Sequence, residues 1–404
     1  MSFKVGHMRI LHTSDWHIGQ KIYEQNRLAE HEQFLDWLLD TIIEREVDIL
    51  LVCGDVFDSS VPPAGAADLY YRFLFDLYKK TTAYAVIIAG NHDSAVRLAA
   101  PREFLQMARI HVVGNISESA RECVVRLDVN GTSAAIAAVP YLNEGDILPH
   151  VSLEGEVERS MRYREAVKKV YEECLSTMDT DIRVLMGHYF IQGGTSSDSE
   201  RLVQIGGINP VRTTDLPPAD YIALGHLHRP QHIQGNGCPV VYSGSPLPLS
   251  FKEAGYDKKI FLIDIRDECT IEEVTVPVFR ELVRLEGTRD DLMARANFED
   301  WKDKYIEVNV HLDGPAIGTA DTLRKAFALR GGKVLVVESV LPSRKGESLS
   351  PEDIKTKSPE EIFCDFYRFT SDEDASPEAL DELLTTFNEL MEFTLKEETR
   401  EEET

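Results

Sequence analysis

Aspartate, asparagine and histidine recur in five short stretches of this chain, and their oxygen and nitrogen atoms are common ligands of divalent metal ions. The stretches are Ser-Asp-Trp-His at 14–17, Gly-Asp-Val-Phe-Asp at 54–58, Gly-Asn-His-Asp at 90–93, Gly-His at 187–188 and Gly-His-Leu-His at 225–228. A single such stretch is a weak signal, because a lone Asp or His at a strand end is usually just polar. Five of them in one chain predict a site that holds more than one metal ion.

Each of the five stretches follows an apolar run rich in β-branched residues, which predicts that each lies at the end of a strand. The apolar runs are residues 9–13, 49–53, 85–89, 183–186 and 221–224. In an open α/β sheet, the carboxyl ends of the strands meet in one crevice, where ligands bind. We therefore expect side chains that are far apart in the sequence to share one metal site.

The candidate metal ligands mix carboxylate, amide and imidazole groups and include no thiolate, which suits Mn²⁺ or Fe²⁺ better than structural Zn²⁺. They are Asp15, His17, Asp55, Asn91, His188, His226 and His228. Two divalent ions roughly 3.5–4 Å apart can clamp a phosphodiester and activate a water for in-line attack. Such a pair needs a bridging carboxylate, and Asp55 is the candidate because it follows the central strand. Glycines precede four of these ligands or ligand groups, where a larger side chain would obstruct the metals.

His92 is adjacent to the candidate ligand Asn91 and is expected to face the substrate rather than the metals. From there it could donate a proton to the leaving oxygen or stabilise charge on the phosphorane. Asp58 is a candidate for orienting His92, and Asp93 has a similar claim. The remaining histidines lack a comparable context and are expected to be structural or exposed; they are His12, His31, His111, His150, His232 and His311.

The spacing of apolar residues also predicts the elements that position these side chains. Helices are expected over 27–45, 66–78, 97–108 and 157–178. The first helices alternate with strands, and this β-α-β-α-β succession predicts a mostly parallel sheet covered by helices. Asn130-Gly131 between two apolar runs predicts a β-hairpin. The polar, glycine-rich stretch 193–207 is either a substrate-contacting loop or a plain surface loop, and the sequence does not decide between the two.

A change of composition near residue 277 predicts the division of the chain into parts. Residues 1–7 end in Gly-His directly before Met8 and are typical of an expression-tag remnant ahead of a native Met8. Residues 8–277 are expected to form the catalytic domain, and 278–345 a small α+β capping domain. Residues 346–404 form an acidic tail with 19 Asp and Glu against 5 Lys and Arg. Two helices are predicted in this tail, beginning with Ser-Pro at 358–359 and at 376–377.

Apolar residues lie on one face of each predicted tail helix, and we refer to them as the tail stripe. The tail stripe consists of Ile362, Phe363, Phe366, Leu380, Leu383, Leu384, Phe387, Leu390 and Met391. It would pack either on the body of the protein or on another protein. The acidity of the tail slightly favours a partner protein.

Composition excludes several classes of protein. The net charge of −26 argues against a protein that coats DNA, without excluding a nuclease. No apolar run approaches transmembrane length and no signal-peptide segment opens the chain, so we expect a cytoplasmic protein that does not bind membranes. The six cysteines are scattered without CxxC pairs, which indicates reduced structural thiols.

The ordered set of five stretches resembles the calcineurin-like metallophosphoesterase superfamily, over residues 15–228. That resemblance implies an α/β fold with a β-sandwich flanked by helices, and two metal ions that share Asp55. One ion would be held by Asp15, His17, Asp55 and His228, and the other by Asp55, Asn91, His188 and His226. It also implies that His92 is catalytic.

Within this superfamily, the sequences SDWHIG, GDVFD, PPADYIALGHLHRPQ and YSGSPLPLSF resemble the SbcD family of bacterial nuclease subunits. The resemblance implies Mn²⁺-dependent cleavage of DNA, exonucleolytic on duplex ends and endonucleolytic on single strands and hairpins. It also implies a homodimer and an SbcC-type coiled-coil ATPase that binds the C-terminal helices. Two alternatives stay open: a metallophosphoesterase of small phosphodiesters or nucleotides, and a scaffold subunit with a silent site. The complete ligand set argues against the silent site.

Overall fold

The computed structural model describes residues 7–116, 119–143, 159–197, 200, 210–235, 237–266, 268–312, 318–340, 358–370, 380 and 383–387. The chain divides into two compact units, Met1–Val310 with Ile317–Glu338 and His311–Ala316 with Ser339–Thr404. Residues 1–6 of the predicted tag remnant lie outside the described residues. The seventh, His7, lies 3.0 Å from Asp264 (Nε2 to Oδ1).

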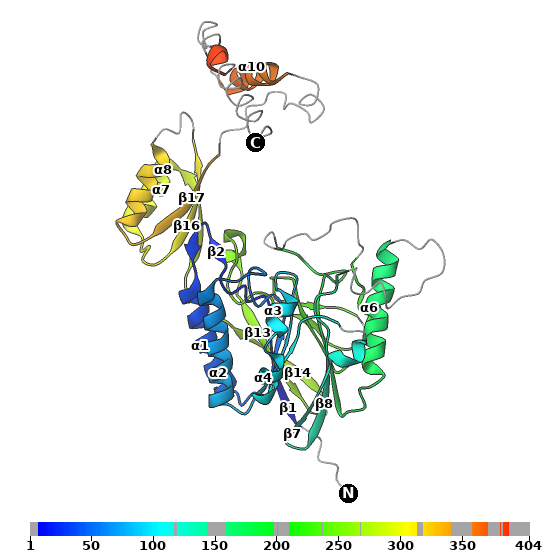
Figure 1. The fold of residues 1–404 in the computed structure, drawn as a ribbon. Helices are drawn as coiled ribbons and strands as arrows, with labels where there is room; N and C mark the ends of the chain where they lie inside the picture. The colour runs from blue at the N-terminus through cyan, green and yellow to red at the C-terminus, as the bar shows by residue number, and fades with distance from the viewer. Residues whose placement is uncertain are drawn as a thin grey trace, which may run out of the picture. The chain divides into compact units, whose positions relative to one another are not determined.

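The first of two six-stranded sheets carries three of the five predicted strand ends (Figure 1). Its order is β14-β13-β1-β4-β5-β6, with β1, β4, β5 and β6 parallel. Its strands are β1 (Met8–Thr13), β4 (Ile49–Cys53), β5 (Tyr84–Ile88), β6 (Ile110–Val113), β13 (Lys259–Ile265) and β14 (Cys269–Thr275). Helices α1 (Leu28–Glu44) and α2 (Ala64–Lys80) cover its outer face, where Leu38 and Phe73 pack in one core with Leu50.

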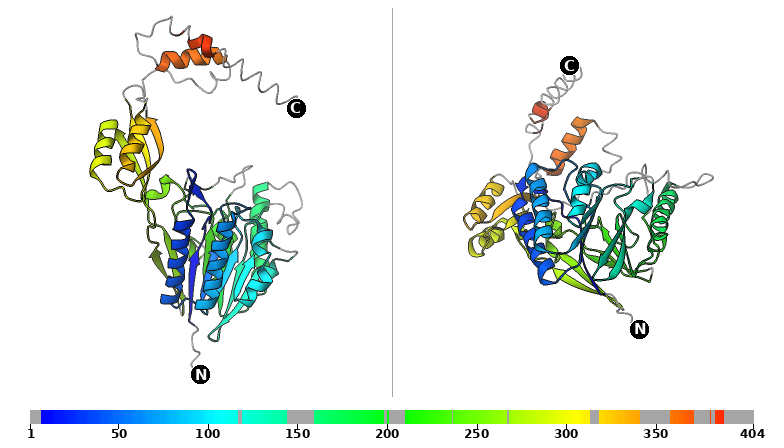
Figure 2. Two further views of the ribbon diagram at one scale, coloured as in Figure 1. Left: turned by 60° about the vertical axis from the view of Figure 1, so that its left-hand side comes forward. Right: turned by 60° about the horizontal axis from the view of Figure 1, so that its bottom comes forward.

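The second six-stranded sheet carries the other two strand ends (Figure 2). Its order is β11-β12-β10-β9-β8-β7. Its strands are β7 (Val124–Val129), β8 (Thr132–Ala138), β9 (Ile182–His188), β10 (Tyr221–Gly225), β11 (Gln231–Ile233) and β12 (Val240–Tyr242). Helix α6 (Arg159–Leu175) covers its outer face, with Tyr171 in one core with Ile222.

The inner faces of the two sheets pack against each other. In β1, Ile10 belongs to the core between the sheets, whereas the next residue, Leu11, belongs to the core under the helices. Strand β4 is buried along its whole length because both of its faces are covered, which explains its continuous apolar sequence. The β-sandwich flanked by helices is therefore confirmed. The mostly parallel sheet expected from the first strands is also confirmed, but the last two strand ends come from a second sheet.

Two local predictions have different outcomes. The hairpin turn is confirmed, because Asn130 and Gly131 have φ angles of 54° and 83°, as a tight type I′ connection requires. The single helix predicted over 97–108 is wrong. The chain forms two shorter helices, α3 (Ala95–Ala99) and α4 (Arg102–Met107), separated at Pro101, whose ring cannot donate a helical hydrogen bond.

A small α+β domain follows β14 of the first sheet along the chain, as predicted. It comprises β15 (Leu282–Thr288), α7 (Arg289–Phe298), β16 (Tyr305–His311), α8 (Thr319–Ala328) and β17 (Lys333–Val340), with strand order β15-β16-β17. Its Leu282 and Tyr305 share a small core with Ile22 and Phe251 of the catalytic domain. The exact boundaries of this capping domain, at 278 and 345, stay predictions.

The described part of the tail contains helix α10 (Pro359–Thr370). The predicted capping box is confirmed, because the Ser358 N–H donates to Glu361 Oε2 (2.8 Å) and the Glu361 N–H donates to Ser358 Oγ (3.3 Å). Residues 383–387 are helical, while the predicted start of this second helix at 376 lies outside the described residues. The rings of Phe363 and Phe387 stack at 4.5 Å, so part of the tail stripe packs on itself.

Two predictions from composition can be compared with the whole described chain. All six cysteines are free, and Cys53, Cys123 and Cys174 are buried. Among the residues that the structure describes, no helix combines the length and the apolar character needed to cross a bilayer.

Candidate metal centre

The five strand ends meet at one edge of the sandwich, where very little space separates the two sheets. A Cβ atom added at Gly225, the last residue of β10, would lie 1.8 Å from the carbonyl oxygen of Cys53 in β4. A Cβ atom added at Gly90 would lie 2.2 Å from Oδ1 of Asp55. These glycines therefore permit close approach of the strand ends and loops to one another, in addition to any room they leave for metals.

The backbone at several candidate ligands is in the left-handed region, which is uncommon for residues other than glycine. The φ angles are 52° at Asp15, 46° at His17, 48° at Asp55 and 96° at His226. Each such residue costs on the order of 1–3 kcal/mol, and residues of this kind cluster at functional sites. Four of the seven candidate ligands therefore lie on backbone of this unusual kind.

Asp55 lies at the centre of the candidate ligands. Its Oδ2 atom is 3.3 Å from Nε2 of His188 and 3.6 Å from Nε2 of His17. Ligand atoms of Asp15, Asp55 and His188 all lie within 4.8 Å of one another, and so do those of Asp15, His17 and His228. Asp55 thus stands between imidazoles from two different sheets, as a bridging carboxylate should.

The remaining candidates surround the oxygen of Asn91. Its Oδ1 atom is 3.0 Å from Nε2 of His188 and 3.1 Å from Nδ1 of His226. The rings of these two histidines are 5.4 Å apart. All seven predicted ligands are therefore gathered in one cluster, and their assignment to particular ions stays a prediction.

The chemistry of this cluster fits a centre of divalent cations. His17 is buried, and neither of its ring nitrogens makes a hydrogen bond, which is costly unless another partner takes them. Asp15 and Asp55 are also buried, and neither forms an ion pair with a lysine or arginine among the described residues. Buried carboxylates without a lysine or arginine partner, beside imidazole nitrogens that make no hydrogen bond, are suitable ligands for Mn²⁺-like ions.

The pKa values of the cluster reflect the same concentration of negative charge. Burial lowers the pKa of His188, but the attraction of Asp55 outweighs burial and raises it to about 9. Burial raises the pKa of Asp55, but His188 and His17 outweigh burial and hold it below its ordinary value. The cluster therefore stabilises positive charge at its centre.

His92 contacts both the bridging candidate and the residue expected to orient it. Its backbone N–H donates to Asp55 Oδ1 (2.8 Å), and its Nδ1 lies 2.9 Å from the backbone carbonyl oxygen of Asp58. Because a carbonyl only accepts, Nδ1 carries the proton in this hydrogen bond. The Asp58 carboxylate lies 3.4 Å from Nδ1 of His17. Asp58 thus contacts His92 through its backbone and His17 through its side chain.

His92 also satisfies the geometry of a ligand. Its ligand atom lies within 4.8 Å of those of His17 and Asp55, and its ring is 4.7 Å from the ring of His17. The structure therefore allows His92 either role, and its catalytic role stays a prediction.

Asp93 has a different task from the one expected. Its carboxylate accepts hydrogen bonds from the N–H groups of Val56 (3.1 Å), Phe57 (2.9 Å) and Gly90 (2.9 Å). It therefore ties the loop after β4 to the loop after β5. Burial raises the pKa of Asp93 to about 6, aided by the neighbouring charge of Asp55.

Two of the other histidines are structural, as predicted. His12 is buried with Nδ1 2.9 Å from the Tyr221 hydroxyl, and burial lowers its pKa to about 3. His31 is buried between the carbonyl oxygens of Arg27 and Trp16, at 2.9 and 3.0 Å. His150 lies outside the described residues.

Sequence reasoning missed the residues that surround His228. Its N–H donates to Glu200 Oε1 (2.6 Å), and its Nδ1 is 3.6 Å from Glu253 Oε1. Glu253 pairs in turn with the buried Lys258. No spacing in the sequence marks these residues, because each reaches His228 through folding of a separate loop.

The described part of the stretch 193–207 contacts the strand end that bears His228. Thr195 and Gln231 exchange two hydrogen bonds, at 2.8 and 2.9 Å, and Glu200 contacts His228 as described above. This stretch is therefore attached to the site, and whether it contacts substrate stays open.

Comparisons with known proteins agree with this geometry. A family model described as calcineurin-like phosphoesterase matches residues 8–230, and a model described as type 5 capsule protein repressor C-terminal domain matches residues 278–371. The SbcD subunit of the nuclease SbcCD from Escherichia coli (strain K12) is 35% identical over 402 residues, which cover 94% of this chain and 97% of that protein. The corresponding SbcCD nuclease subunits from Bacillus subtilis and Rhodobacter capsulatus are 33% and 32% identical, over 76% and 88% of this chain and 78% and 94% of their own lengths.

Proposed function

Because this chain belongs to the SbcD family of nuclease subunits within the calcineurin-like phosphoesterases, we propose that it hydrolyses phosphodiester bonds of DNA with two bound divalent ions. The observation that carries the proposal is the position of Asp55, whose Oδ2 lies between Nε2 of His188 and Nε2 of His17. A phosphodiesterase of this kind needs one carboxylate common to both ions.

The resemblance to the calcineurin-like phosphoesterases implies the proposed ligand sets, and the proximity of these residues supports them. One ion would be held by Asp15, His17, Asp55 and His228, and the other by Asp55, Asn91, His188 and His226. When bound, the pair of ions polarises the phosphodiester and lowers the pKa of a water. We propose Mn²⁺ as the ion because the donors are carboxylate, amide and imidazole.

The protein's own residues supply positioning and a proton. The Nδ1–H of His92 is directed at the Asp58 carbonyl, and we propose that Nε2 faces the leaving oxygen of the substrate. The backbone bond from His92 to Asp55 fixes the distance between this ring and the bridge. Protonated at Nε2, His92 would act as the general acid.

We propose that DNA is the substrate and that an SbcC-type ATPase is the partner, on the basis of the relatives' names and the extent of the match. Cleavage of duplex ends, single strands and hairpins, a homodimer, a cytoplasmic location and docking through the C-terminal helices belong to the same proposal. The capping domain and the tail favour a nuclease over an enzyme of small phosphodiesters, which has less need of either.

One assay compares the candidate functions. The full chain, freed of metal and then supplied with Mn²⁺, is incubated with linear duplex DNA, a DNA hairpin and bis-para-nitrophenyl phosphate. We expect cleavage of all three, and loss of all three activities after chelation. Cleavage of the small diester without cleavage of either DNA would favour the small-substrate enzyme, and no cleavage at all would reject a catalytic role.

A further inference from the structure

Residues that are not candidate ligands contact both the backbone and the ring of His228. Its carbonyl oxygen accepts hydrogen bonds from Nζ of Lys258 (3.2 Å) and from the backbone N–H of Ser245 (3.2 Å). Its N–H donates to Glu200. The Nδ1 side of its ring faces the carboxylate of Glu253, at 3.6 Å. The proposed role of His228 as a metal ligand does not by itself explain these four polar contacts.

The two oxygens of Glu253 have separate partners. Oε2 accepts from Lys258 Nζ (2.5 Å) and from the backbone N–H of Leu249 (3.1 Å). Oε1 accepts from Ser197 Oγ (3.3 Å) and is the atom that faces His228. The carboxylate is therefore fixed on one side by Lys258 and presents its other oxygen to the imidazole.

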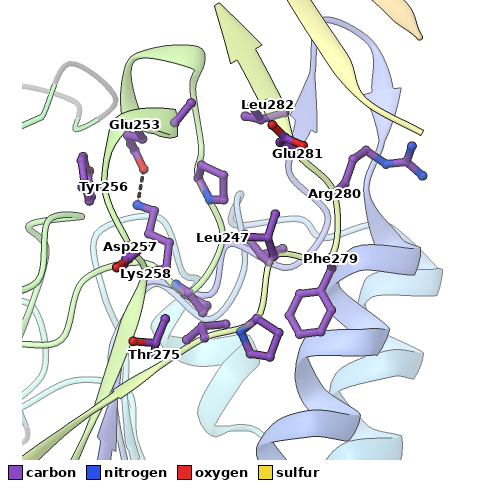
Figure 3. Close-up of a pocket in the computed structure, with 17 residues that line it drawn as sticks. Leu247, Glu253, Tyr256, Asp257, Lys258, Thr275, Phe279, Arg280, Glu281 and Leu282 are labelled. Atoms are coloured by element: carbon purple, nitrogen blue, oxygen red, sulfur yellow. Dashed lines mark hydrogen bonds and ion pairs between the residues drawn. The ribbon is translucent and has the colours of Figure 1, made fainter. Parts of the chain in front are cut away.

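Stability alone does not explain this buried pair. Glu253 is 0% exposed and Lys258 is 6% exposed, and Figure 3 shows them together in the wall of a cavity of about 240 Å³. Removing two charges from water costs several kcal/mol per ion, so apolar residues of similar size often give equal or greater stability. A buried Lys–Glu pair next to a candidate metal ligand therefore calls for a different explanation.

We propose that Glu253 is the positioning residue of His228. Its Oε1 attracts the Nδ1–H of the imidazole, so that Nε2 carries the lone pair and is directed toward Asp15 and His17. Lys258 holds Glu253 and the His228 carbonyl in one arrangement. A carboxylate that fixes the tautomer of a metal-binding histidine typically contributes 10- to 100-fold to metal affinity. This inference rests on the proposed function, because it presumes that His228 binds an ion.

The test measures binding of Mn²⁺ to the metal-free full chain by titration calorimetry, with electron paramagnetic resonance to count bound ions. Glu253→Gln keeps the size of the side chain and removes its charge. We expect one of the two ions to bind 10- to 100-fold more weakly and the other to bind with little change.

Glu253→Gln leaves Lys258 as an unpaired buried charge, which could itself prevent folding. The double variant Glu253→Gln with Lys258→Met removes both charges and should fold. We expect it to show the same weak binding of one ion as the single variant. Binding of both ions with wild-type affinity in the double variant would overturn the proposal, because Glu253 would then only neutralise Lys258.

Glu30→Gln is the matched control. Glu30 is also buried and pairs with Arg280 (2.7 Å), and its ion pairs in the described structure include no candidate ligand. We expect its melting temperature to fall while both affinities stay unchanged. An equal loss of affinity in this control would overturn the proposal. Fewer than two ions on the wild-type chain would instead count against the proposed two-ion function.

Discussion

The backbone N–H of His92 donates a hydrogen bond to Oδ1 of Asp55, at 2.8 Å. The other oxygen of Asp55 faces the imidazoles of His17 and His188. The carboxylate that is proposed to bridge the two ions therefore also holds the backbone of the proposed general acid. Since this contact uses the backbone of His92, changing the His92 side chain leaves it in place. A change of Asp55 would remove the bridging carboxylate and would also weaken the hydrogen bond that positions His92.

Asp55→Asn should abolish the binding of both ions and all phosphodiesterase activity, while the fold is retained. Asparagine keeps the size of the side chain but removes the negative charge from the position that both ions share. Metal content and calorimetry measure binding, circular dichroism checks the fold, and bis-para-nitrophenyl phosphate measures activity. Full activity of this variant at saturating Mn²⁺ would reject Asp55 as the bridge.

His92→Gln should lower turnover by about 10²- to 10⁴-fold, the usual range for acid–base assistance, without loss of metal. Glutamine keeps the backbone hydrogen bond to Asp55 and lacks only the imidazole. Turnover and calorimetric metal binding are measured on the same preparation. Loss of an ion would identify His92 as a ligand, which its distance from His17 and Asp55 also permits.

The affinity for Mn²⁺ should increase as the pH rises toward about 9. Burial lowers the pKa of His188 and Asp55 raises it, to a net value of about 9, so in the metal-free protein the imidazole is protonated below that pH. A ligand imidazole must be neutral, and each displaced proton weakens binding roughly tenfold per pH unit below the pKa. Calorimetry in buffers of different ionisation enthalpy measures the released protons. Heats that do not depend on the buffer would contradict this prediction.

The strand ends were predictable because each is a local pattern. An apolar run followed by Asp, Asn or His identifies both the strand and the ligand, as at 49–55 and 221–228. Even there the partition of the strands between two sheets was not visible, since a run such as 183–186 fits either a single sheet or a sandwich. The two-sheet sandwich was predicted only from the resemblance to a known superfamily.

Side-chain partners across long loops were not predictable. Asp58 was expected to orient His92, but the sequence did not indicate that its carbonyl would lie beside His92 Nδ1 and its carboxylate beside His17 Nδ1. Glu253 and Lys258 contact His228 only because the chain returns to the site after β12. The division of the predicted helix 97–108 could have been predicted, because Pro101 lacks the N–H that a continuous helix needs.

Gly90→Ala should lower activity by about 10²-fold, although it changes no candidate ligand. The added Cβ would lie 2.2 Å from Oδ1 of Asp55 and 2.3 Å from its backbone nitrogen, so the bridge must move, and a displacement of about 1 Å can cost this much. Activity and metal affinity are measured against Gly287→Ala, where the nearest atom would be at an ordinary 3.6 Å. Equal activity of the two variants would show that Asp55 tolerates displacement.

Truncation after Lys345 should abolish co-purification with an SbcC-type ATPase, while Mn²⁺-dependent cleavage of bis-para-nitrophenyl phosphate survives. Burial of each Leu or Phe of the tail stripe is worth roughly 1.5–3 kcal/mol, so several together support a complex after ordering costs. Phe363 already stacks on Phe387, whereas Leu383 is 45% exposed and available to a partner. The tail has 19 acidic and 5 basic residues, and this excess of negative charge should make association weaken as salt is added.

A two-residue variant, Leu383→Ser with Leu384→Ser, separates docking from other effects of the truncation. It leaves the stacked pair Phe363 and Phe387 unchanged and removes two members of the tail stripe, so it should weaken co-purification and leave the melting temperature of the catalytic domain unchanged. If the stripe instead covers the catalytic domain, the truncated chain would melt earlier and lose small-diester activity as well. Unchanged affinity of the truncated chain for the ATPase would end the docking hypothesis.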